Sequence, residues 1–440
     1  MAQRPNVIFI VADDLGFADL GCYGGRDAEF GKVSPNLDRL AGDGIRFTQG
    51  YSNSPVCSPT RFALMTARYQ YRLRGAAEEP INSKSRGSTT LGLPVEHPTV
   101  PSLLKQAGYR TALIGKWHLG YPPTFGPLRS GYDEFFGPMS GGVDYFTHCS
   151  SNGQHDLWFG EEERQEEGYL TDLLSRRAVD YIDRMAADGN KPFFLSLHYT
   201  APHWPWETRD DEAVAQDVKA NLFHLHGGNI HTYRRMIHHM DEGIGWVMDA
   251  LRRHGMDRDT LVIFTSDNGG ERFSDNWPLV GGKMDLTEGG IRVPWIAHWP
   301  ATIRPGQVSA QHCMTMDWST TVIEAAGAKA DPAYPLDGVS LLPVLQDATR
   351  TFARPLHWRM NHRGQRALRD DDWKYLRVDG HDYLFDIPAD ERERANLAGR
   401  DPARLAAMRE AWESWNATMP AIPEDATVSL GYGVKDMPQR

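Results

Sequence analysis

A cysteine and an arginine lie one helical turn apart in the run 57–61, Cys-Ser-Pro-Thr-Arg. Residues 62–68 that follow are good helix formers, and Pro59 suits the first helical position. Cys57 is therefore predicted at a helix N-terminus, where free backbone N–H groups favour an anion, and the planar guanidinium of Arg61 matches a tetrahedral oxyanion. A cysteine in this place is a candidate nucleophile. The alternative is a small buried apolar side chain, the usual environment of a free cysteine.

Asp13, Asp14, Asp267 and Asn268 offer only oxygen ligands, three of them anionic. This set suits a hard divalent cation rather than zinc. Adjacent aspartates in a regular strand would point to opposite faces, so the chain must leave the strand here for both to reach one ion, and Gly16 permits such a bend. Each residue alone could be a helix cap or turn residue. Four of them after two strands favour a metal site.

Four apolar, strand-like runs lead into these residues and into other charged ones. The runs are residues 7–12, 111–114, 192–197 and 261–264. They lead to Asp13, to Lys116 and His118, to His203, and to Asp267, in that order. In an open α/β sheet ligands bind outside the carboxyl ends of the strands. The four runs therefore predict one shared site at that edge.

Helical patterns between the strands, at residues 34–41, 100–107, 170–185 and 233–253, favour a doubly wound, mostly parallel α/β sheet. We expect residues 1–345 to form this catalytic domain. Residues 346–440 are expected to form a smaller α+β domain, with short antiparallel strands at 356–360, 365–368, 373–378 and 383–385 and a closing helix at 401–417. Two long loops, 70–98 and 138–168, either shape the site or are mobile surface insertions.

Composition excludes several classes of partner. The chain has 440 residues, 40% of them apolar, and a formal charge of −11 without basic runs, which argues against nucleic acid or an anionic membrane as partner. An anionic substrate would then need a local positive pocket. We see neither a signal peptide nor an apolar run long enough to span a membrane, so a cytoplasmic protein is expected. Four widely spaced cysteines do not suggest a disulfide framework.

At run 57–61 the sequence resembles the type I sulfatase family of the alkaline phosphatase superfamily. That family's signature is Cys-x-Pro-x-Arg followed by a helix ending in Thr-Gly-Arg, and residues 66–68 here read Thr-Ala-Arg. Further family motifs match residues 13–16 (Asp-Asp-Leu-Gly), 266–269 (Ser-Asp-Asn-Gly), 108–120 with Lys116 and His118, 201–203 (Ala-Pro-His), and Lys283 ahead of 288–294. The likeness runs from residue 6 to about residue 345.

The resemblance implies an enzyme, a sulfuric ester hydrolase, that converts sulfate monoesters to alcohol and inorganic sulfate. A maturation enzyme of the family oxidises the signature cysteine, here Cys57, to formylglycine. The hydrate of that aldehyde attacks sulfur and forms a covalent sulfo-enzyme intermediate. The expected metal is Ca²⁺, with Mg²⁺ as the alternative, held by Asp13, Asp14, the modified Cys57, Asp267 and Asn268.

Five basic side chains would surround the sulfate with positive charge: Arg61, Lys116, His118, His203 and Lys283. His203 or Lys283 would protonate the departing oxygen. His118 would take the second hydroxyl proton, so that the aldehyde reforms and sulfate is expelled.

Two other functions compete with this one. A phosphonate or phosphate ester hydrolase of the same superfamily would use the same motifs, and a sulfate-binding protein without turnover would result if Cys57 stays a thiol. Lys116, His118 and Lys283, present together with the metal set, favour the sulfatase. The expected partners are a small-molecule or saccharide sulfate ester and the formylglycine-generating enzyme. These motifs leave open whether the alcohol is a sugar, an aryl or an alkyl group.

Overall fold

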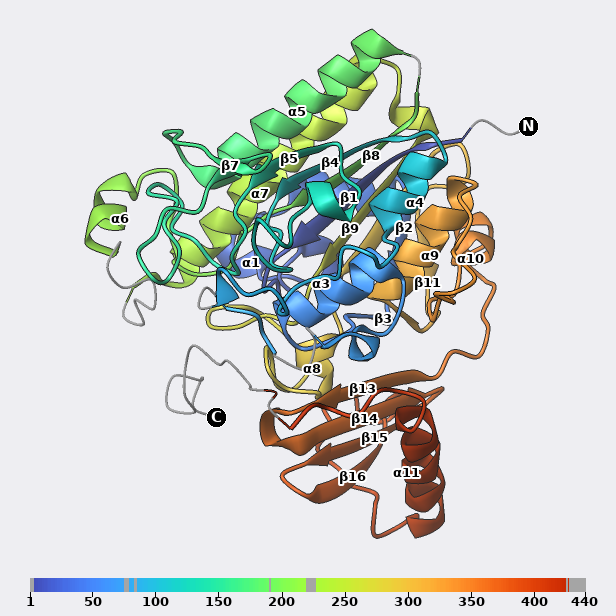
Figure 1. The fold of residues 1–440 in the computed structure, drawn as a ribbon. Coiled ribbons are helices and arrows are strands. Elements are labelled where there is room, and N and C mark those ends of the chain that lie inside the picture. Colours follow the sequence, from blue (N-terminus) through green and yellow to red (C-terminus); the bar gives the residue numbers. More distant parts are fainter. Residues whose placement is uncertain are drawn as a thin grey trace.

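The structure is a computed structural model that describes residues 4–74, 79–82, 85–189, 191–218, 227–424 and 426. Its main part is a ten-stranded mixed sheet covered by helices (Figure 1). The strand order is β11-β2-β10-β9-β1-β8-β4-β5-β6-β7. The bounds are β1 Asn6–Ala12, β2 Ile45–Phe47, β4 Arg110–Gly115, β5 Glu134–Gly137, β6 Trp158–Phe159, β7 Glu162–Glu163, β8 Phe193–His198, β9 Thr260–Ser266, β10 Trp295–His298 and β11 Gln307–Ser309.

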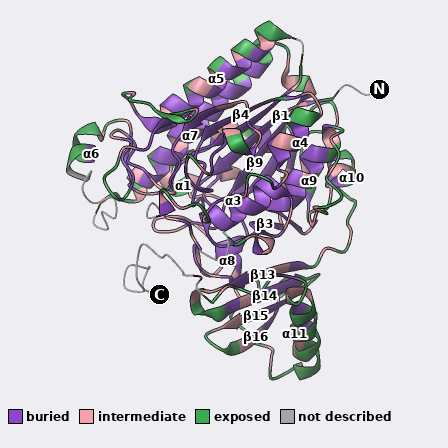
Figure 2. Ribbon diagram, in the orientation of Figure 1, coloured by how far each residue is buried: buried purple, intermediate pink, exposed green. Residues whose placement is uncertain are grey.

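Strand β1 lies at the centre of the sheet, with parallel neighbours on both sides, β8 and β9. Its alternating side chains enter two different cores: Ile8 and Ile10 pack on one face of the sheet, and Val7 and Phe9 on the other. A strand buried on both faces requires the continuous β-branched and aromatic run seen in this sequence. Figure 2 shows the central strands buried and the outer sides of the covering helices exposed.

Helices cover both faces of the sheet, as a doubly wound fold requires. One layer holds α2 (Pro35–Gly42), α5 (Leu170–Asp188) and α7 (Ile230–Arg253), and the other holds α3 (Cys57–Thr66), α4 (Val100–Gln106) and α9 (Thr315–Ala325). The expected mostly parallel α/β class is confirmed. The predicted helices and strands are present with ends that move by one to three residues.

The sheet continues beyond the predicted strands. β10 pairs antiparallel with both β9 and β2, and β6 and β7 extend the opposite edge as an antiparallel pair. These strands are two to four residues long, too short to show a periodic pattern in the sequence. β6 and β7 lie inside the segment 138–168, which we had expected to be a loop.

Residues beyond about 350 form a separate sheet beneath the main one in Figure 1. Its four antiparallel strands are β13 Leu356–Met360, β14 Gln365–Asp370, β15 Trp373–Val378 and β16 His381–Asp386, and α11 (Pro402–Asn416) packs on them. This is the predicted C-terminal antiparallel sheet and closing helix. The predicted domain boundary at residue 345 lies within α10 (Leu342–Gln346) and stays a prediction.

Smaller elements connect these parts. They are α1 Asp27–Phe30, β3 Gly50–Tyr51 paired with β12 Cys313–Met314, α6 Glu212–Val218 and α8 Glu288–Ile291. Among the described helices, none has the length and hydropathy needed to cross a membrane. Cys22, Cys57, Cys149 and Cys313 are all unpaired thiols.

Candidate active site

The carboxyl ends of β1, β4, β8 and β9 meet at one edge of the sheet. Backbone hydrogen bonds continue past the strands there: Asp13 N donates to Ala201 O (3.1 Å), Asp267 N to Ala12 O (3.1 Å), and Lys116 N to His198 O (2.8 Å). The ladder therefore fixes the first residue after each strand and not only the strand itself. This brings the predicted residues of four distant segments together.

Four of the predicted metal ligands form one buried group. The ligand atoms of Asp13, Asp14, Cys57 and Asp267 all lie within 4.8 Å of one another. Asp14 has φ 62°, so the chain leaves the strand between the two aspartates, as the sequence required. Asn268 Nδ2 donates to Asp14 Oδ1 at 2.7 Å and joins the same group.

The donor set fits a hard cation. Asp13 Oδ1 and Asn268 Oδ1 are buried and have no hydrogen-bond partner among the described residues. Burial, and then the neighbouring Asp267 carboxylate, raises the pKa of Asp13 to about 8. Crowded carboxylates, beside one unused carboxylate oxygen and one unused amide oxygen, indicate that positive charge belongs between them, and such oxygen ligands suit a hard cation.

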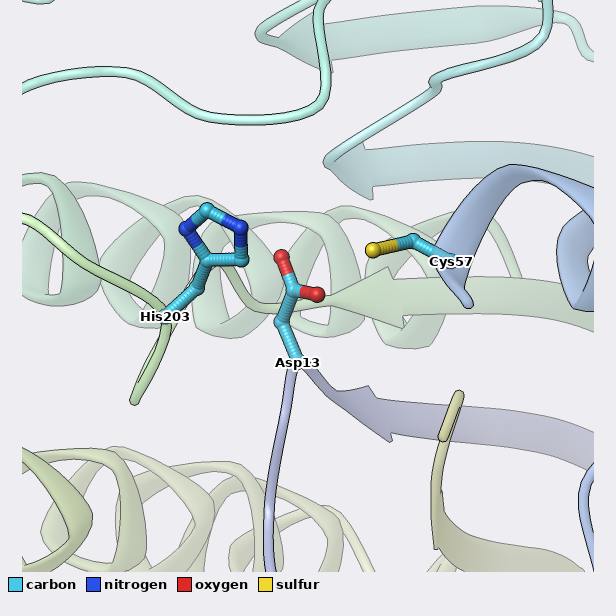
Figure 3. A group of neighbouring side chains, drawn as sticks. All are labelled: Asp13, Cys57 and His203. Atoms are coloured by element: carbon cyan, nitrogen blue, oxygen red, sulfur yellow. The ribbon is translucent and has the colours of Figure 1, made fainter. Parts of the chain in front are cut away.

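Cys57 lies at the start of helix α3, as predicted. The prediction was wrong in one detail: Pro59 is the third helical residue, still within the first turn, where its missing N–H leaves no intrahelical bond unmade. Figure 3 shows the sulfur pointing towards the Asp13 carboxylate, with the His203 ring on the far side of that carboxylate. Burial raises the pKa of the Cys57 thiol, so the unmodified side chain is protonated near neutral pH.

Arg61 is buried and bonded to protein groups on every nitrogen. Its Nε and Nη2 donate to Asp267 Oδ2 at 3.0 and 2.8 Å, and its Nη1 donates to Lys116 O at 3.0 Å. Nη1 also lies 3.3 Å from His198 Nδ1. The guanidinium therefore fixes Asp267 within the group of candidate ligands. The predicted contact of Arg61 with sulfate stays a prediction.

His198 was missed by the sequence analysis. It is the last residue of β8 and is buried beside Arg61. Its position at a strand end is the same signal that identified the aspartates. The predicted run stopped one residue short of it.

The two predicted lysines pair with the two aspartates that follow β1. Lys116 Nζ lies 2.5 Å from Asp13 Oδ2, and Lys283 Nζ lies 2.7 Å from Asp14 Oδ2. His203 Nε2 is 3.6 Å from the same Asp14 oxygen. Burial alone would raise the pKa of Asp14, but Lys283 and His203 hold it at about 2. The predicted cationic groups thus line the group of ligands on several sides.

His118, two residues after Lys116, has a strained backbone conformation with φ 59°. Its Nε2 lies 2.5 Å from Ile81 O, a carbonyl of the long segment 70–98, and its Nδ1 is buried without a partner among the described residues. Burial, followed by the charge of Lys116, lowers its pKa well below the ordinary value. A neutral imidazole with an unused nitrogen is suited to accept a proton.

The segment that begins the second long loop closes over both histidines. A Cβ added at Gly141 would lie 2.4 Å from His118 Cε1, and one at Gly142 would lie 3.0 Å from His203 Cε1. Only residues without a side chain fit so close to the rings. The expectation that this segment shapes the site agrees with these contacts.

Together, the fold and the site define an alkaline phosphatase-like α/β protein with a buried group of candidate metal ligands beside a helix N-terminus. The chain belongs to the sulfatase family: the family profile "Sulfatase" matches residues 5–328. A second profile, "N-sulphoglucosamine sulphohydrolase, C-terminal", matches residues 282–411.

Similar proteins agree with this membership. N-acetylgalactosamine-6-sulfatase of Mus musculus is 34% identical over 78% of this chain and 66% of its own length. The Homo sapiens protein of that name is 33% identical over 81% of this chain and 68% of its own length. The solved structure of Ps i-CgsB in complex with k-i-k-neocarrahexaose is 32% identical, with a TM-score of 0.83 over 96% of this chain and 94% of that one. The chain thus spans about two thirds of the two mammalian relatives' length.

Proposed function

We propose that this protein hydrolyses sulfate monoesters to an alcohol and inorganic sulfate. The observation that carries the proposal is the buried group in which the ligand atoms of Asp13, Asp14, Cys57 and Asp267 lie within 4.8 Å of one another, with Lys116 and Lys283 paired to two of them. A concentrated set of cationic donors next to a metal site stabilises an anion whose charge shifts during ester cleavage. Membership of the sulfatase family supports sulfate as that anion.

The proposal includes two groups that complete the site. Cys57 would be oxidised to formylglycine, whose hydrate supplies a nucleophilic hydroxyl that the protonated thiol lacks. A hard cation, Ca²⁺ or Mg²⁺, would be held by Asp13, Asp14, Asp267, Asn268 and the modified residue 57, and would supply Lewis-acid polarisation.

The remaining roles belong to side chains whose places are described above. Once the charges of Asp13 and Asp14 are compensated, Lys116 and Lys283 can donate to sulfate oxygens. His118 Nδ1 accepts a proton from the hydroxyl at residue 57, since this nitrogen is unpartnered among the described residues and the lowered pKa keeps the ring in its neutral form. His203 or Lys283 protonates the departing alcohol, because both lie against Asp14 at the same side of the site.

We propose a sulfated saccharide as the substrate class. Two observations support it: the mammalian relatives carry the name N-acetylgalactosamine-6-sulfatase, and Ps i-CgsB was solved with a carrahexaose. Trp204, whose ring lies 4.4 Å from that of His203, offers an aromatic surface at the site on which a sugar ring can pack. Cytoplasmic residence and dependence on a maturation enzyme remain predictions.

The test is a turnover panel on protein co-expressed with a formylglycine-generating enzyme. The panel holds sulfated mono- and oligosaccharides, aryl sulfates, and phosphate and phosphonate esters with matched leaving groups, and peptide mass analysis reports the state of residue 57. We expect the highest kcat/KM with a sulfated saccharide, and none of this turnover from Cys57→Ala.

Two results would overturn parts of the proposal. Clear preference for a phosphonate diester would assign the protein to the phosphorus-directed alternative. Full-rate sulfate ester hydrolysis by protein that carries only a thiol at residue 57 would exclude the proposed role of formylglycine.

A further inference from the structure

Lys283 lies in a tight turn, residues 281–286, that packs against the C-terminal sheet. Lys283 N donates to Gly270 O at 3.1 Å, and Met284 N donates to Pro55 O at 2.9 Å. Met284 has φ 79°, in the left-handed region that a residue with a Cβ rarely adopts. The surroundings therefore hold this turn in a conformation that its own sequence does not favour.

One glutamine of the C-terminal sheet bonds to the two peptide groups on either side of Asp285, just after Lys283. Gln365, the first residue of β14, donates from Nε2 to Met284 O at 2.8 Å and accepts at Oε1 from Leu286 N at 2.9 Å. Its side chain is 2% exposed, so water does not compete for these bonds. These two hydrogen bonds thus hold the backbone of Met284 in its left-handed conformation.

A second contact from the same sheet fixes helix α8, a few residues further on. Lys374 of β15 places Nζ 2.9 Å from Glu288 Oε1 and 2.9 Å from Glu393 Oε1, and all three side chains are at most 1% exposed. Glu288 Oε2 accepts from Tyr51 OH at 2.8 Å. Buried charges of this kind must keep their partners, so the ion pair fixes the start of α8 against β15.

Helix α8 in turn touches both sides of the active site. Gly269, next to the ligand Asn268, donates from its N to Gly290 O at 2.9 Å. A Cβ at Gly290 would lie 1.9 Å from Asp285 O and 2.4 Å from Gly282 O. Helix α8 and the Lys283 turn are closely packed, with no room for a side chain between them, so a displacement of one displaces the other.

We propose that Gln365 and Lys374 are positioning residues, through which the C-terminal sheet sets the place of Lys283 in the active site. Gln365 holds the strained turn directly, and Lys374 holds the helix against which the turn is packed. The structural part of this inference stands on the contacts alone. Its consequence for catalysis rests on the proposed function.

Hydrogen–deuterium exchange tests the structural part without any substrate. Gln365→Met keeps the volume but removes both of these bonds, together with a weaker one from Nε2 to His362 O at 3.2 Å. We expect exchange of residues 281–291 to rise about tenfold in this variant while residues 6–12 of β1 stay protected. The control is Arg377→Met on the neighbouring strand β15, which removes a half-exposed ion pair to Asp382 inside the C-terminal sheet. Unchanged exchange at 281–291 in Gln365→Met would overturn the inference.

A double-mutant cycle tests the catalytic part. Gln365→Met should lower kcat/KM for a sulfate ester by about 10- to 100-fold, as expected when a group that contacts substrate is slightly misplaced. In a Lys283→Ala background the same change should have no further effect, since the group it positions is absent. Equal losses in both backgrounds would show that Gln365 does not act through Lys283.

Two further measurements keep the outcomes distinct. Gln365→Glu retains the acceptor for Leu286 N, and we expect an intermediate effect on both exchange and kcat/KM; it also replaces the methionine variant if that protein does not fold. If the wild-type protein turned over no sulfate ester, the proposed function would fail while the exchange result would still decide the structural part.

Discussion

Two clusters of buried polar and charged side chains lie near the turn that contains Lys283, and their hydrogen bonding differs. The edge cluster, at the carboxyl ends of the strands, consists of Asp13, Asp14, Lys116, Asp267 and Lys283. The seam cluster, where the C-terminal sheet meets α8, consists of Tyr51, Glu288, Lys374 and Glu393. The side chains of both clusters are almost fully removed from solvent.

The clusters differ in what they leave open. In the seam cluster Lys374 lies between two carboxylates, and the second oxygens of Glu288 and Glu393 accept from Tyr51 OH and Glu288 N. In the edge cluster three carboxylates crowd together, and Asp13 Oδ1 has no partner among the described residues. A closed cluster joins two parts of the fold, whereas an open one keeps ligand atoms for a cation and a substrate.

The largest expected effect, on metal binding and on kcat/KM, comes from removing two carboxylates from the edge cluster. Asp13→Ala combined with Asp267→Ala should abolish metal binding and lower kcat/KM by at least about 10³-fold, since the charge that polarises the ester is lost. Metal analysis of the wild-type protein should give about one equivalent of a hard cation. Glu393→Gln in the seam cluster is the control and should retain the metal. Full metal content in the double variant would remove the distinction between the clusters.

A comparable loss should come from the residue that the edge cluster surrounds. Cys57→Ser supplies one hydroxyl where the hydrated aldehyde supplies two, so the variant should release about one equivalent of alcohol and then stall as a stable sulfate ester of the serine. Intact-mass measurement after incubation with substrate detects the adduct. In mature enzyme, His118→Ala should slow the release of sulfate from residue 57, the same step at which the serine variant stalls. Continuous turnover by the serine variant without an adduct would contradict the proposal that a second hydroxyl is needed to expel sulfate.

At the seam we expect a loss of stability instead of metal. Lys374→Met leaves two buried carboxylates without their shared cation and should lower the free energy of unfolding by about 3–5 kcal/mol. Arg377→Met, which removes a half-exposed ion pair from the same strand, should cost less than about 1 kcal/mol. Urea unfolding measures both. A Lys374→Met protein as stable as wild type would mean that the seam ion pair does not hold the sheet.

The smallest effect concerns pH. Burial raises the pKa of Glu393 from 4.5 to about 7, although Lys374 opposes the shift. Between these values the folded protein keeps a proton that the unfolded chain has lost, so this residue's contribution to stability falls as pH rises from about 4.5 to about 7. Glu393→Gln should remove that part of the pH dependence. Unfolding curves at pH 5 and pH 7.5 decide it, and an unchanged difference between them would contradict the assignment.

Most of the edge cluster, and Cys57 beside it, could be predicted from sequence because these residues follow a recognisable strand or begin a recognisable helix. Lys283 lies in a turn and was identified only through the family resemblance. Asp13 follows β1, Asp267 follows β9, and Cys57 starts α3, so local patterns were enough to bring them to one edge. The parallel core of the fold was predicted from the same local patterns. It could not give β10, whose four residues show no period and whose antiparallel place depends on two neighbouring strands.

The seam cluster and the contacts behind the site could not be predicted in this way. Gln365 and Met284 are 81 residues apart, and nothing near either residue indicates the other. Ile81 O reaches His118 from residues 79–82, which form neither helix nor strand, and the two bonds from Arg61 to Asp267 appear only once the edge is assembled. Local sequence predicts which residues arrive at the site; the partners that hold them are set by tertiary packing.

The burial of helix α3 also constrains the order of events in the life of the chain. All ten residues from Cys57 to Thr66 are buried, and Cys57 itself is 3% exposed. If Cys57 is oxidised as proposed, the modifying enzyme would need access to this segment and would have to act before the rest of the domain covers the helix. Modification and folding would then compete for the newly made chain.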